Sequence, residues 1–305
     1  MSATEHGTED ISRRQAWLIA ARPQTLPAAA APVIVGVGLA VRDGVTAPLP
    51  AAAALLGAIL IQIGTNFAND YYDAVQGADT EAREGFTRVT AGGLIDPTEV
   101  KRAMWLTFAA AIVVGVYLVG GVPILVSGLL SVASGIAYTG GPYPLGYHGL
   151  GDLFVFVFFG LIAVTGTYYV QAAAELGVAF ATLVPRTELV PLAALVASLP
   201  IAAISTNILV VNNVRDKEED STTGKRTLAA EYVILLGMAY TVPVVFTLST
   251  GDLTTLLPLV TLPLGVSVTK TVLTETSGEA LNPALERTGK LLAAFAVLFA
   301  VGLAV

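Results

Sequence analysis

The chain has 305 residues, of which 54% are hydrophobic and only 13% are charged, against roughly 25% charged residues in an average soluble protein. It contains no cysteine and has a formal net charge of −7, so disulfides, thiolate metal sites and cysteine nucleophiles are excluded, and nucleic acid is not an expected partner. Apolar stretches recur from residue 24 onward, each long enough to cross a bilayer as a helix. We therefore expect an all-α integral membrane protein surrounded by membrane lipid.

In chain order, a polar segment at 1–12 is expected to be disordered, and residues 13–305 are expected to form one membrane domain. Two polar loops, at about 71–102 and 214–227, are predicted to cap a central cavity of this domain on one side. Nine apolar segments are predicted to be transmembrane helices around this cavity, and they cover about 24–41, 50–70, 103–120, 122–139, 152–171, 189–213, 228–248, 253–271 and 289–305.

The basic residues indicate how the chain crosses the membrane. If the N-terminus is cytoplasmic, only Arg42 and Arg186 among the Lys and Arg residues fall in outer segments. Cytoplasmic loops of membrane proteins are enriched in Lys and Arg, whereas outer loops are not. We therefore predict a multi-pass protein of the cell membrane with a cytoplasmic N-terminus, cytoplasmic capping loops and an outer C-terminus.

The second predicted span ends in a cluster of side chains that carry oxygen. Asn66, Asp70 and Asp73 are spaced four and three residues apart, so a helix places them on one face, and Asn69 and Asp79 lie close by in the sequence. Carboxylates that share a face repel one another unless a cation lies between them. Mg²⁺ binds oxygen ligands and keeps positions for substrate phosphates, so it is the expected cation. A chance cluster at a helix end is the alternative for this stretch alone.

A second cluster repeats this spacing at the end of the sixth predicted span. Asn212, Asp216 and Glu219 match the first cluster position by position, and Asp220 adds a carboxylate one helical turn after Asp216. Both clusters lie where a span reaches the cytoplasmic surface, so two related halves are expected to present acidic faces to one cavity. The predicted metal ligands are Asp70, Asp73, Asp79, Asp216 and Asp220. Whether Asp73, Asp79 or Glu219 completes the metal shell is left open.

A cavity with two acidic faces also needs positive charge and a ligand. Mg²⁺ between the faces would hold a diphosphate, and Lys and Arg side chains would bind its oxygens. The predicted diphosphate-binding residues are Asn66, Arg88, Asn212, Arg215, Lys225 and Arg226. The residues expected to carry the catalysis are Asp70, Asp73, Asp216, Asp220 and Lys225.

These segments resemble the aspartate-rich motifs of the UbiA-type membrane prenyltransferases. Within that family, the similarity is greatest to the branch that acts on 1,4-dihydroxy-2-naphthoate in menaquinone synthesis. The chain has Gly77 where many relatives place a further Asp, and it lacks the basic residues that relatives acting on 4-hydroxybenzoate tend to have at 140–151. The motifs that carry the resemblance are R-P-Q-T-L-P at 22–27, N-D-Y-Y-D at 69–73, G-A-D-T at 77–80, Y-T-G-G-P-Y-P-L at 138–145, G-D-L-F-V-F-V-F-F-G at 151–160, R-D-x-x-x-D at 215–220 and G-K-R-T-L-A at 224–229.

The resemblance implies a membrane prenyltransferase domain over 13–305 that uses Mg²⁺ to transfer a polyprenyl chain from polyprenyl diphosphate to an aromatic acceptor. With the naphthoate as acceptor, CO₂ would be lost and demethylmenaquinone would form. Metal ions and basic side chains would neutralise the leaving diphosphate, and a dry cavity would protect the allylic cation from water. Tyr138, Tyr143 and Asp152 are the candidate acceptor contacts, although each also fits an interfacial aromatic residue or an Asp at a helix start.

Two alternatives stay open at this point. The same chemistry would serve 4-hydroxybenzoate, a chlorin or a glyceryl phosphate as acceptor. An ion-coupled transporter would also place carboxylates in a membrane protein, but it would need them near the midplane rather than at the inner surface.

Overall fold

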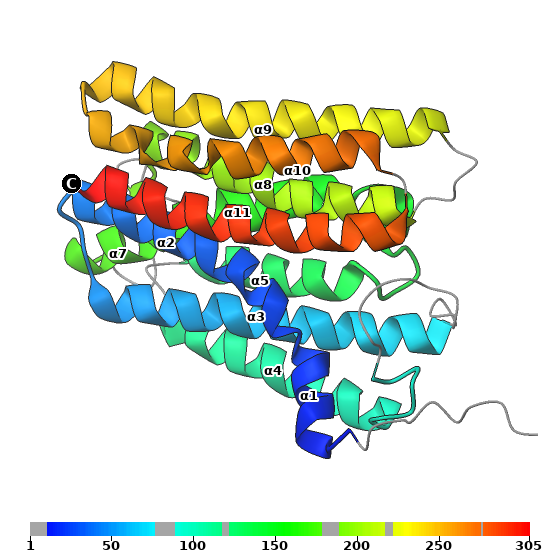
Figure 1. Cartoon of the computed structure of the whole chain (residues 1–305). Helices are drawn as coiled ribbons and strands as arrows, with labels where there is room; N and C mark the ends of the chain where they lie inside the picture. The colour runs from blue at the N-terminus through cyan, green and yellow to red at the C-terminus, as the bar shows by residue number, and fades with distance from the viewer. Residues whose placement is uncertain (1–10, 77–88, 118–121, 179–188, 217–221, 276) are drawn as a thin grey trace, which may run out of the picture.

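The structure is a computed structural model that describes residues 11–76, 89–117, 122–178, 189–216, 222–275 and 277–305. Every regular element in these residues is a helix, and the helices run side by side as one bundle (Figure 1). The elements are α1 (Arg13–Ala21), η1 (Pro23–Thr25), α2 (Leu26–Arg42), α3 (Pro48–Gln76), α4 (Pro97–Tyr117), α5 (Val122–Ala137), η2 (Leu145–His148), α6 (Gly151–Val155), η3 (Phe156–Ile162), α7 (Ala163–Glu175), α8 (Leu192–Asp216), α9 (Thr222–Thr250), η5 (Leu253–Thr261), α10 (Leu262–Thr274) and α11 (Gly278–Ala304).

The expected all-α membrane architecture is confirmed. Within the described residues, 8 helical stretches are long and apolar enough to cross a bilayer, as judged by length and composition. Three of them consist of consecutive elements, namely α1, η1 and α2 over 13–42, α6, η3 and α7 over 151–175, and η5 with α10 over 253–274. The predicted fourth span corresponds to α5, which is apolar but has only 16 residues. The count of nine spans therefore stays a prediction.

Two helices extend beyond the limits expected from hydropathy. α3 continues to Gln76 instead of ending near residue 70, so the first residues of the expected capping loop are helical. α11 begins at Gly278 instead of residue 289, with the Ser277 hydroxyl accepting a hydrogen bond from the backbone N–H of Ala280 as an N-cap. Hydropathy marks the part of a helix that suits lipid, but the backbone hydrogen bonds continue wherever polar side chains find partners or solvent.

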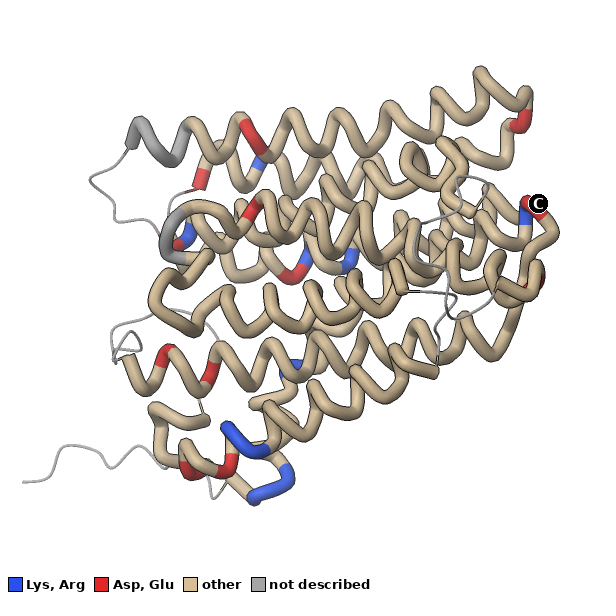
Figure 2. The backbone as a smooth tube through the Cα atoms, turned by 180° about the vertical axis from the view of Figure 1, so that it is seen from behind, with Lys and Arg blue, Asp and Glu red and all other residues tan. Residues whose placement is uncertain are grey.

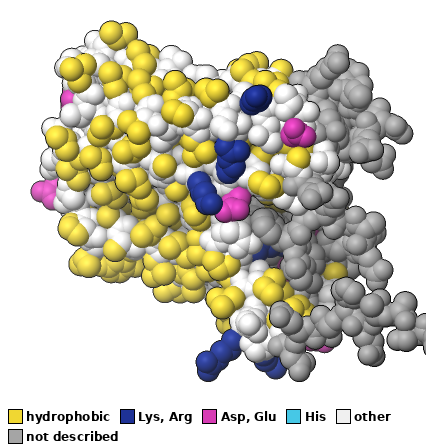
Figure 3. Space-filling model, in the orientation of Figure 1, with side chains coloured by type: hydrophobic (Ala, Val, Ile, Leu, Met, Phe, Trp, Pro, Cys, Tyr) yellow, Lys and Arg dark blue, Asp and Glu magenta, His cyan; other side chains and the backbone are white. Residues whose placement is uncertain are grey.

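Helix α8 lies inside the bundle and organises the packing around it. In its most apolar window 72% of the residues are buried, against 22% for α4. α8 packs along α9 and α11, α2 packs along α11, and α3 packs along α4. Most charged residues outside the grey segments gather at one end of the bundle (Figure 2), and hydrophobic side chains cover its flank (Figure 3). This distribution suits a protein whose flank faces lipid.

Glycines allow the closest helix contacts. A Cβ added at Gly38 of α2 would lie 2.6 Å from both the Cα and the carbonyl oxygen of Ala300 on α11. A Cβ at Gly160 of η3 would collide with Ala202 on α8. In membranes, such close backbone approach replaces the hydrophobic effect as a source of helix association.

We expect Gly38→Ala to lower the thermal unfolding temperature in detergent clearly, because α2 and α11 must move apart to admit the new Cβ. The matched control is Gly289→Ala on α11, where an added Cβ would meet no atom of the described residues within 4 Å. That change should be neutral or slightly stabilising, since Ala favours a helix over Gly by about 1 kcal/mol. Equal melting temperatures for the two variants would contradict this account of the α2–α11 contact.

Candidate active site

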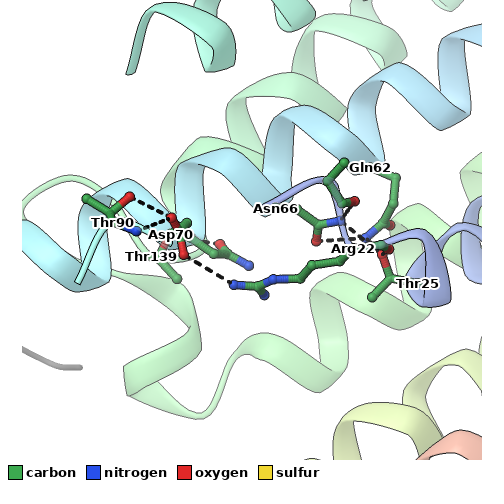
Figure 4. A network of polar contacts seen from close by, with 9 residues as sticks. Arg22, Thr25, Gln62, Asn66, Asp70, Thr90 and Thr139 are labelled. Atoms are coloured by element: carbon green, nitrogen blue, oxygen red, sulfur yellow. Dashed lines mark hydrogen bonds and ion pairs between the residues drawn. The ribbon is translucent and has the colours of Figure 1, made fainter. Parts of the chain in front are cut away.

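The first predicted cluster lies on α3 and is buried. Asp70 is only 1% exposed. Its Oδ2 accepts hydrogen bonds from the backbone N–H of Thr90 (3.1 Å) and from the Thr90 hydroxyl (2.5 Å). Its Oδ1 lies 4.0 Å from Nη2 of Arg22 (Figure 4). A buried carboxylate is thus held between a hydroxyl donor from one segment and a guanidinium from another.

Arg22 reaches this position because of an unusual backbone conformation. It has a φ of 49°, and among the described residues it is the only non-glycine residue with positive φ. Its N–H caps the carbonyls of Leu18 and Ile19 at the end of α1, and Pro23 follows, which cannot continue the helix. The left-handed conformation costs about 1–2 kcal/mol for a residue with a Cβ. It turns a buried guanidinium toward Asp70.

Asn66 and Gln62 form a hydrogen-bonded network with the same turn. Asn66 Nδ2 donates to the carbonyl of Ala21 (2.9 Å) and to the Thr25 hydroxyl (2.9 Å). Gln62 Nε2 donates to Thr25 Oγ1 (3.1 Å) and to Asn66 Oδ1 (3.3 Å). Because both groups of the Asn66 amide bind protein, Asn66 is placed to fix the turn that carries Arg22.

Asp73 and Tyr138 connect this cluster to the loop after α5. Asp73 is 2% exposed, one helical turn after Asp70. Tyr138 follows α5 directly, and its ring packs against Gly146 and Gly151. Tyr138 lies close enough to the carboxylates of Asp152 and Asp73 to interact with them electrostatically. A tyrosine hydroxyl is neutral at physiological pH, so that of Tyr138 is available as a hydrogen-bond donor.

The second predicted cluster forms its own network on α8. Arg215 Nε donates to Asp216 Oδ1 (2.7 Å), and its Nη2 donates to Asn212 Oδ1 (2.7 Å). Asn212 Nδ2 donates to Asp216 Oδ2 (3.1 Å), and Arg215 Nη1 donates to Asn282 Oδ1 of α11 (3.1 Å). The Arg215 side chain is 4% exposed and that of Asp216 31%. The buried guanidinium therefore orients a carboxylate that solvent or a ligand can reach.

The other predicted site residues are placed as follows. Asp152 lies in α6, and its buried Oδ1 has no hydrogen-bond partner among the described residues. Tyr143 is 56% exposed in the loop after α5. Lys225 and Arg226 belong to α9, but their side chains are outside the described part of the structure. The residues that lie wholly outside the described ranges are Asp79, Arg88, Glu219 and Asp220.

A cavity of about 330 Å³ leads away from the first cluster. Gln62, Asn66, Asn69 and Tyr138 make its polar end, and most of the remaining lining is apolar. The lining side chains come from α2, α3, α4, α5, α6, η3 and α7, and no described residue of α8 to α11 is among them. The cavity was expected at the centre of the bundle, but it lies beside the first cluster. The centre is filled by α8, which packs against α2, α9 and α11.

The sequence profile of the UbiA prenyltransferase family matches residues 29–287, which is most of the chain. The chain belongs to the UbiA prenyltransferase family. The expected enzyme class, a prenyltransferase, is thereby confirmed.

Individual relatives agree with this membership. The chain is 37% identical to the 1,4-dihydroxy-2-naphthoate octaprenyltransferase of Escherichia coli K12, over 97% of both chains. It is 36% identical to the enzyme of the same name from Mycobacterium tuberculosis H37Rv, over 94% of this chain and 96% of the relative. Its fold matches that of a UbiA homolog from Archaeoglobus fulgidus bound to DMAPP and Mg²⁺, with a TM-score of 0.52 and 14% identity, over 93% of this chain and 99% of that one.

The donor set of the first cluster suits a cation of the Mg²⁺ type. Asp70 and Asp73 supply carboxylate oxygens one turn apart, and Asp70 Oδ1 is buried without a hydrogen-bond partner among the described residues. Those residues contain no group of three or more His, Cys, Asp or Glu side chains that could hold a metal by itself. Mg²⁺ commonly takes one or two carboxylates together with waters and substrate phosphates. The residues therefore fit a Mg²⁺ ion that binds together with a diphosphate.

Sequence reasoning missed Arg22, Thr25, Gln62 and Thr90 as parts of the site. Arg22 counted only as one of many basic residues on the inner side, although R-P-Q-T at 22–25 contributed to the family resemblance. That motif was the available signal for Arg22 and Thr25. Gln62 and Thr90 carry no comparable signal, because their roles depend on contacts with distant parts of the chain.

Proposed function

We propose that this UbiA-family protein transfers a polyprenyl chain from polyprenyl diphosphate to 1,4-dihydroxy-2-naphthoate, with loss of CO₂. The observation that carries the proposal is the 37% identity to the E. coli 1,4-dihydroxy-2-naphthoate octaprenyltransferase over 97% of both chains. The product is demethylmenaquinone in its reduced form. The proposed site lies at the cytoplasmic end of the bundle in the cell membrane, with the N-terminus inside and the C-terminus outside.

Asp70 and Asp73 from α3, with Asp216 from α8, would hold Mg²⁺, and Asp79 and Asp220 are the further proposed ligands. When bound, Mg²⁺ neutralises the charge that develops on the leaving diphosphate. Arg22 and Arg215 are the buried cations beside the two clusters. They hold the diphosphate oxygens by charge-assisted hydrogen bonds, a role that Arg88, Lys225 and Arg226 share in the proposal.

The cavity provides a path for the isoprenoid chain. It follows α3 from Asn69 to Ala54, which corresponds to about 22 Å at 1.5 Å per residue. Its apolar walls exclude water from the allylic cation that forms at the polar end. A cation next to Tyr138 would also be stabilised by the face of the aromatic ring.

The proposed acceptor contacts are Tyr138, Tyr143 and Asp152. The carboxylated carbon of the electron-rich naphthoate ring attacks the allylic cation. The new carbon–carbon bond forms at this ring carbon. The bond to the carboxylate then breaks, its electron pair restores the aromatic ring, and CO₂ leaves. No ring proton has to be removed, so Asp152 and the neutral Tyr138 hydroxyl are assigned to binding rather than to proton abstraction.

Parallel assays with two acceptors test this assignment. Purified protein with Mg²⁺ and octaprenyl diphosphate should turn over 1,4-dihydroxy-2-naphthoate with release of one CO₂ per product. We expect kcat/KM for 4-hydroxybenzoate to be lower by about 100-fold or more, because a site shaped for one ring leaves polar groups unpaired around another. Product analysis and trapping of labelled CO₂ provide the measurement. Turnover of 4-hydroxybenzoate alone, or a naphthoate product that keeps its carboxylate, would overturn the proposal.

A further inference from the structure

The orientation of the Gln62 amide follows from the hydrogen bonds around it (Figure 4). The carbonyl of Ala21 can only accept a hydrogen bond, so the Asn66 amide must turn its Nδ2 group toward Ala21. Asn66 Oδ1 then faces Gln62, and because this oxygen is an acceptor, the Gln62 amide must turn its Nε2 group toward it. The Thr25 hydroxyl donates to the Arg22 carbonyl (2.9 Å) and therefore accepts from Gln62 and Asn66. The backbone carbonyls of Ala21 and Arg22 therefore determine which way the Asn66 and Gln62 amides point.

This arrangement leaves the other end of the Gln62 amide without a partner. Gln62 is 7% exposed, and its Oε1 has no hydrogen-bond partner among the described residues. Other residues of the described chain also have a buried polar atom of this kind, among them Asp70, Asp152, Gln171, Ser205 and Asn207. Of the residues in this group, only Gln62 lines the cavity. A buried acceptor beside a cavity lowers stability unless a ligand or a water supplies a donor.

We propose that Gln62 binds the aromatic acceptor, with Oε1 accepting a hydrogen bond from a phenolic hydroxyl group of the ring. This inference rests on the proposed function, because it names a specificity contact in the same site. Gln62 lines the cavity one helical turn before Asn66 and close to the polar end, where the ring must meet the allylic carbon. It thus lies between the region that holds the diphosphate and the apolar path of the chain.

The chemistry of the other substrate supports the same assignment. The oxygens of an ionised diphosphate and the carbons of an isoprenoid chain are not hydrogen-bond donors, so neither group can satisfy Gln62 Oε1 directly. A phenolic acceptor has an O–H donor, and 1,4-dihydroxy-2-naphthoate has two. A site built to bind a hydroxyl discriminates strongly against an analogue that lacks it, because its own polar group is then left buried and unpaired.

The first arm of the test uses the unaltered protein and two analogues. 1-Hydroxy-2-naphthoate and 4-hydroxy-2-naphthoate each lack one hydroxyl of the proposed acceptor and are measured as competitive inhibitors against it. We expect one of the two to bind more weakly than the parent by about 10-fold or more. If 4-hydroxybenzoate proves to be the acceptor, benzoate is the matching analogue, so the contact is tested even if the naphthoate assignment fails. Equal affinity for all the compounds would overturn the inference.

The second arm replaces Gln62 by Leu and by Met, so that one variant is available if the other folds poorly. Both should lose the discrimination between the hydroxylated and the deoxygenated compound, which is compared within each variant because the loss of the Gln62 hydrogen bonds to Thr25 and Asn66 also affects the turn that carries Arg22. The matched control is Thr65→Val, a nearly isosteric change in the same cavity wall, since the Thr65 hydroxyl already donates to the Ile61 carbonyl (2.8 Å). Thr65→Val should keep the discrimination. Discrimination that persists in both Gln62 variants would assign Oε1 to a water molecule and overturn the inference.

Discussion

Replacing Asp70 by Asn is expected to lower the rate of prenyl transfer by about 10³-fold, while the protein stays folded in detergent. Asp70 is buried, faces the Arg22 guanidinium and is a proposed ligand of the Mg²⁺ that neutralises the leaving diphosphate. Asn has the same shape but no charge. Product formation from octaprenyl diphosphate at saturating Mg²⁺ is the measurement, with gel filtration and thermal unfolding as tests of the fold.

Asn is a better test than Ala at this position. The Asp70 carboxylate accepts two hydrogen bonds from Thr90, and an Asn side-chain oxygen can still accept them. Ala would leave those donors buried and without an acceptor, so lost activity would be confounded with lost stability. The matched control is Asp252→Asn, in the loop before η5, where the carboxylate accepts hydrogen bonds from Thr254. Transfer that survives in Asp70→Asn would contradict the role proposed for this carboxylate.

The fold could be predicted from hydropathy because lipid imposes a simple rule. A helix in a bilayer needs about 20 apolar residues, so the spans are visible without knowledge of their packing. The rule fails where a helix leaves the lipid. α3 continues to Gln76 because its polar face is buried in the bundle, where Asp70 and Asp73 lie. The length of such a helix depends on tertiary partners that hydropathy does not contain.

The candidate site could likewise be predicted only in part. The carboxylate spacing at Asp70 and Asp73 was readable because helical periodicity is a local property. The position of Arg22 could not be predicted in this way. It depends on the left-handed backbone conformation of Arg22 at the end of α1 and on contacts of this turn with α3, more than forty residues along the chain. The proposed role of Gln62 is the least predictable from the sequence, since it comes from a side-chain oxygen that the surrounding hydrogen bonds leave without a partner among the described residues.

Asp216→Asn should reduce transfer by about 10³-fold while the protein stays folded. An Asn side chain can still accept from the Arg215 guanidinium, but it removes the charge that is paired with this buried group, so we expect the free energy of unfolding to fall by about 1–3 kcal/mol. The matched control is Glu99→Gln, which removes another exposed carboxylate that is paired with an arginine, Arg13. Glu99 has no proposed role in transfer, so this variant should keep its activity.

The double variant Asp70→Asn with Asp216→Asn decides whether the two clusters act on one diphosphate. If both carboxylates serve the same ionisation step, removing the second should cost little once the first is lost, because residues that act as a unit are not additive. Two independent sites would instead multiply the losses. We therefore expect the double variant to be about as slow as the slower single variant in the same product assay. Full activity in both single variants, or a loss equal to the product of the two, would refute a shared site.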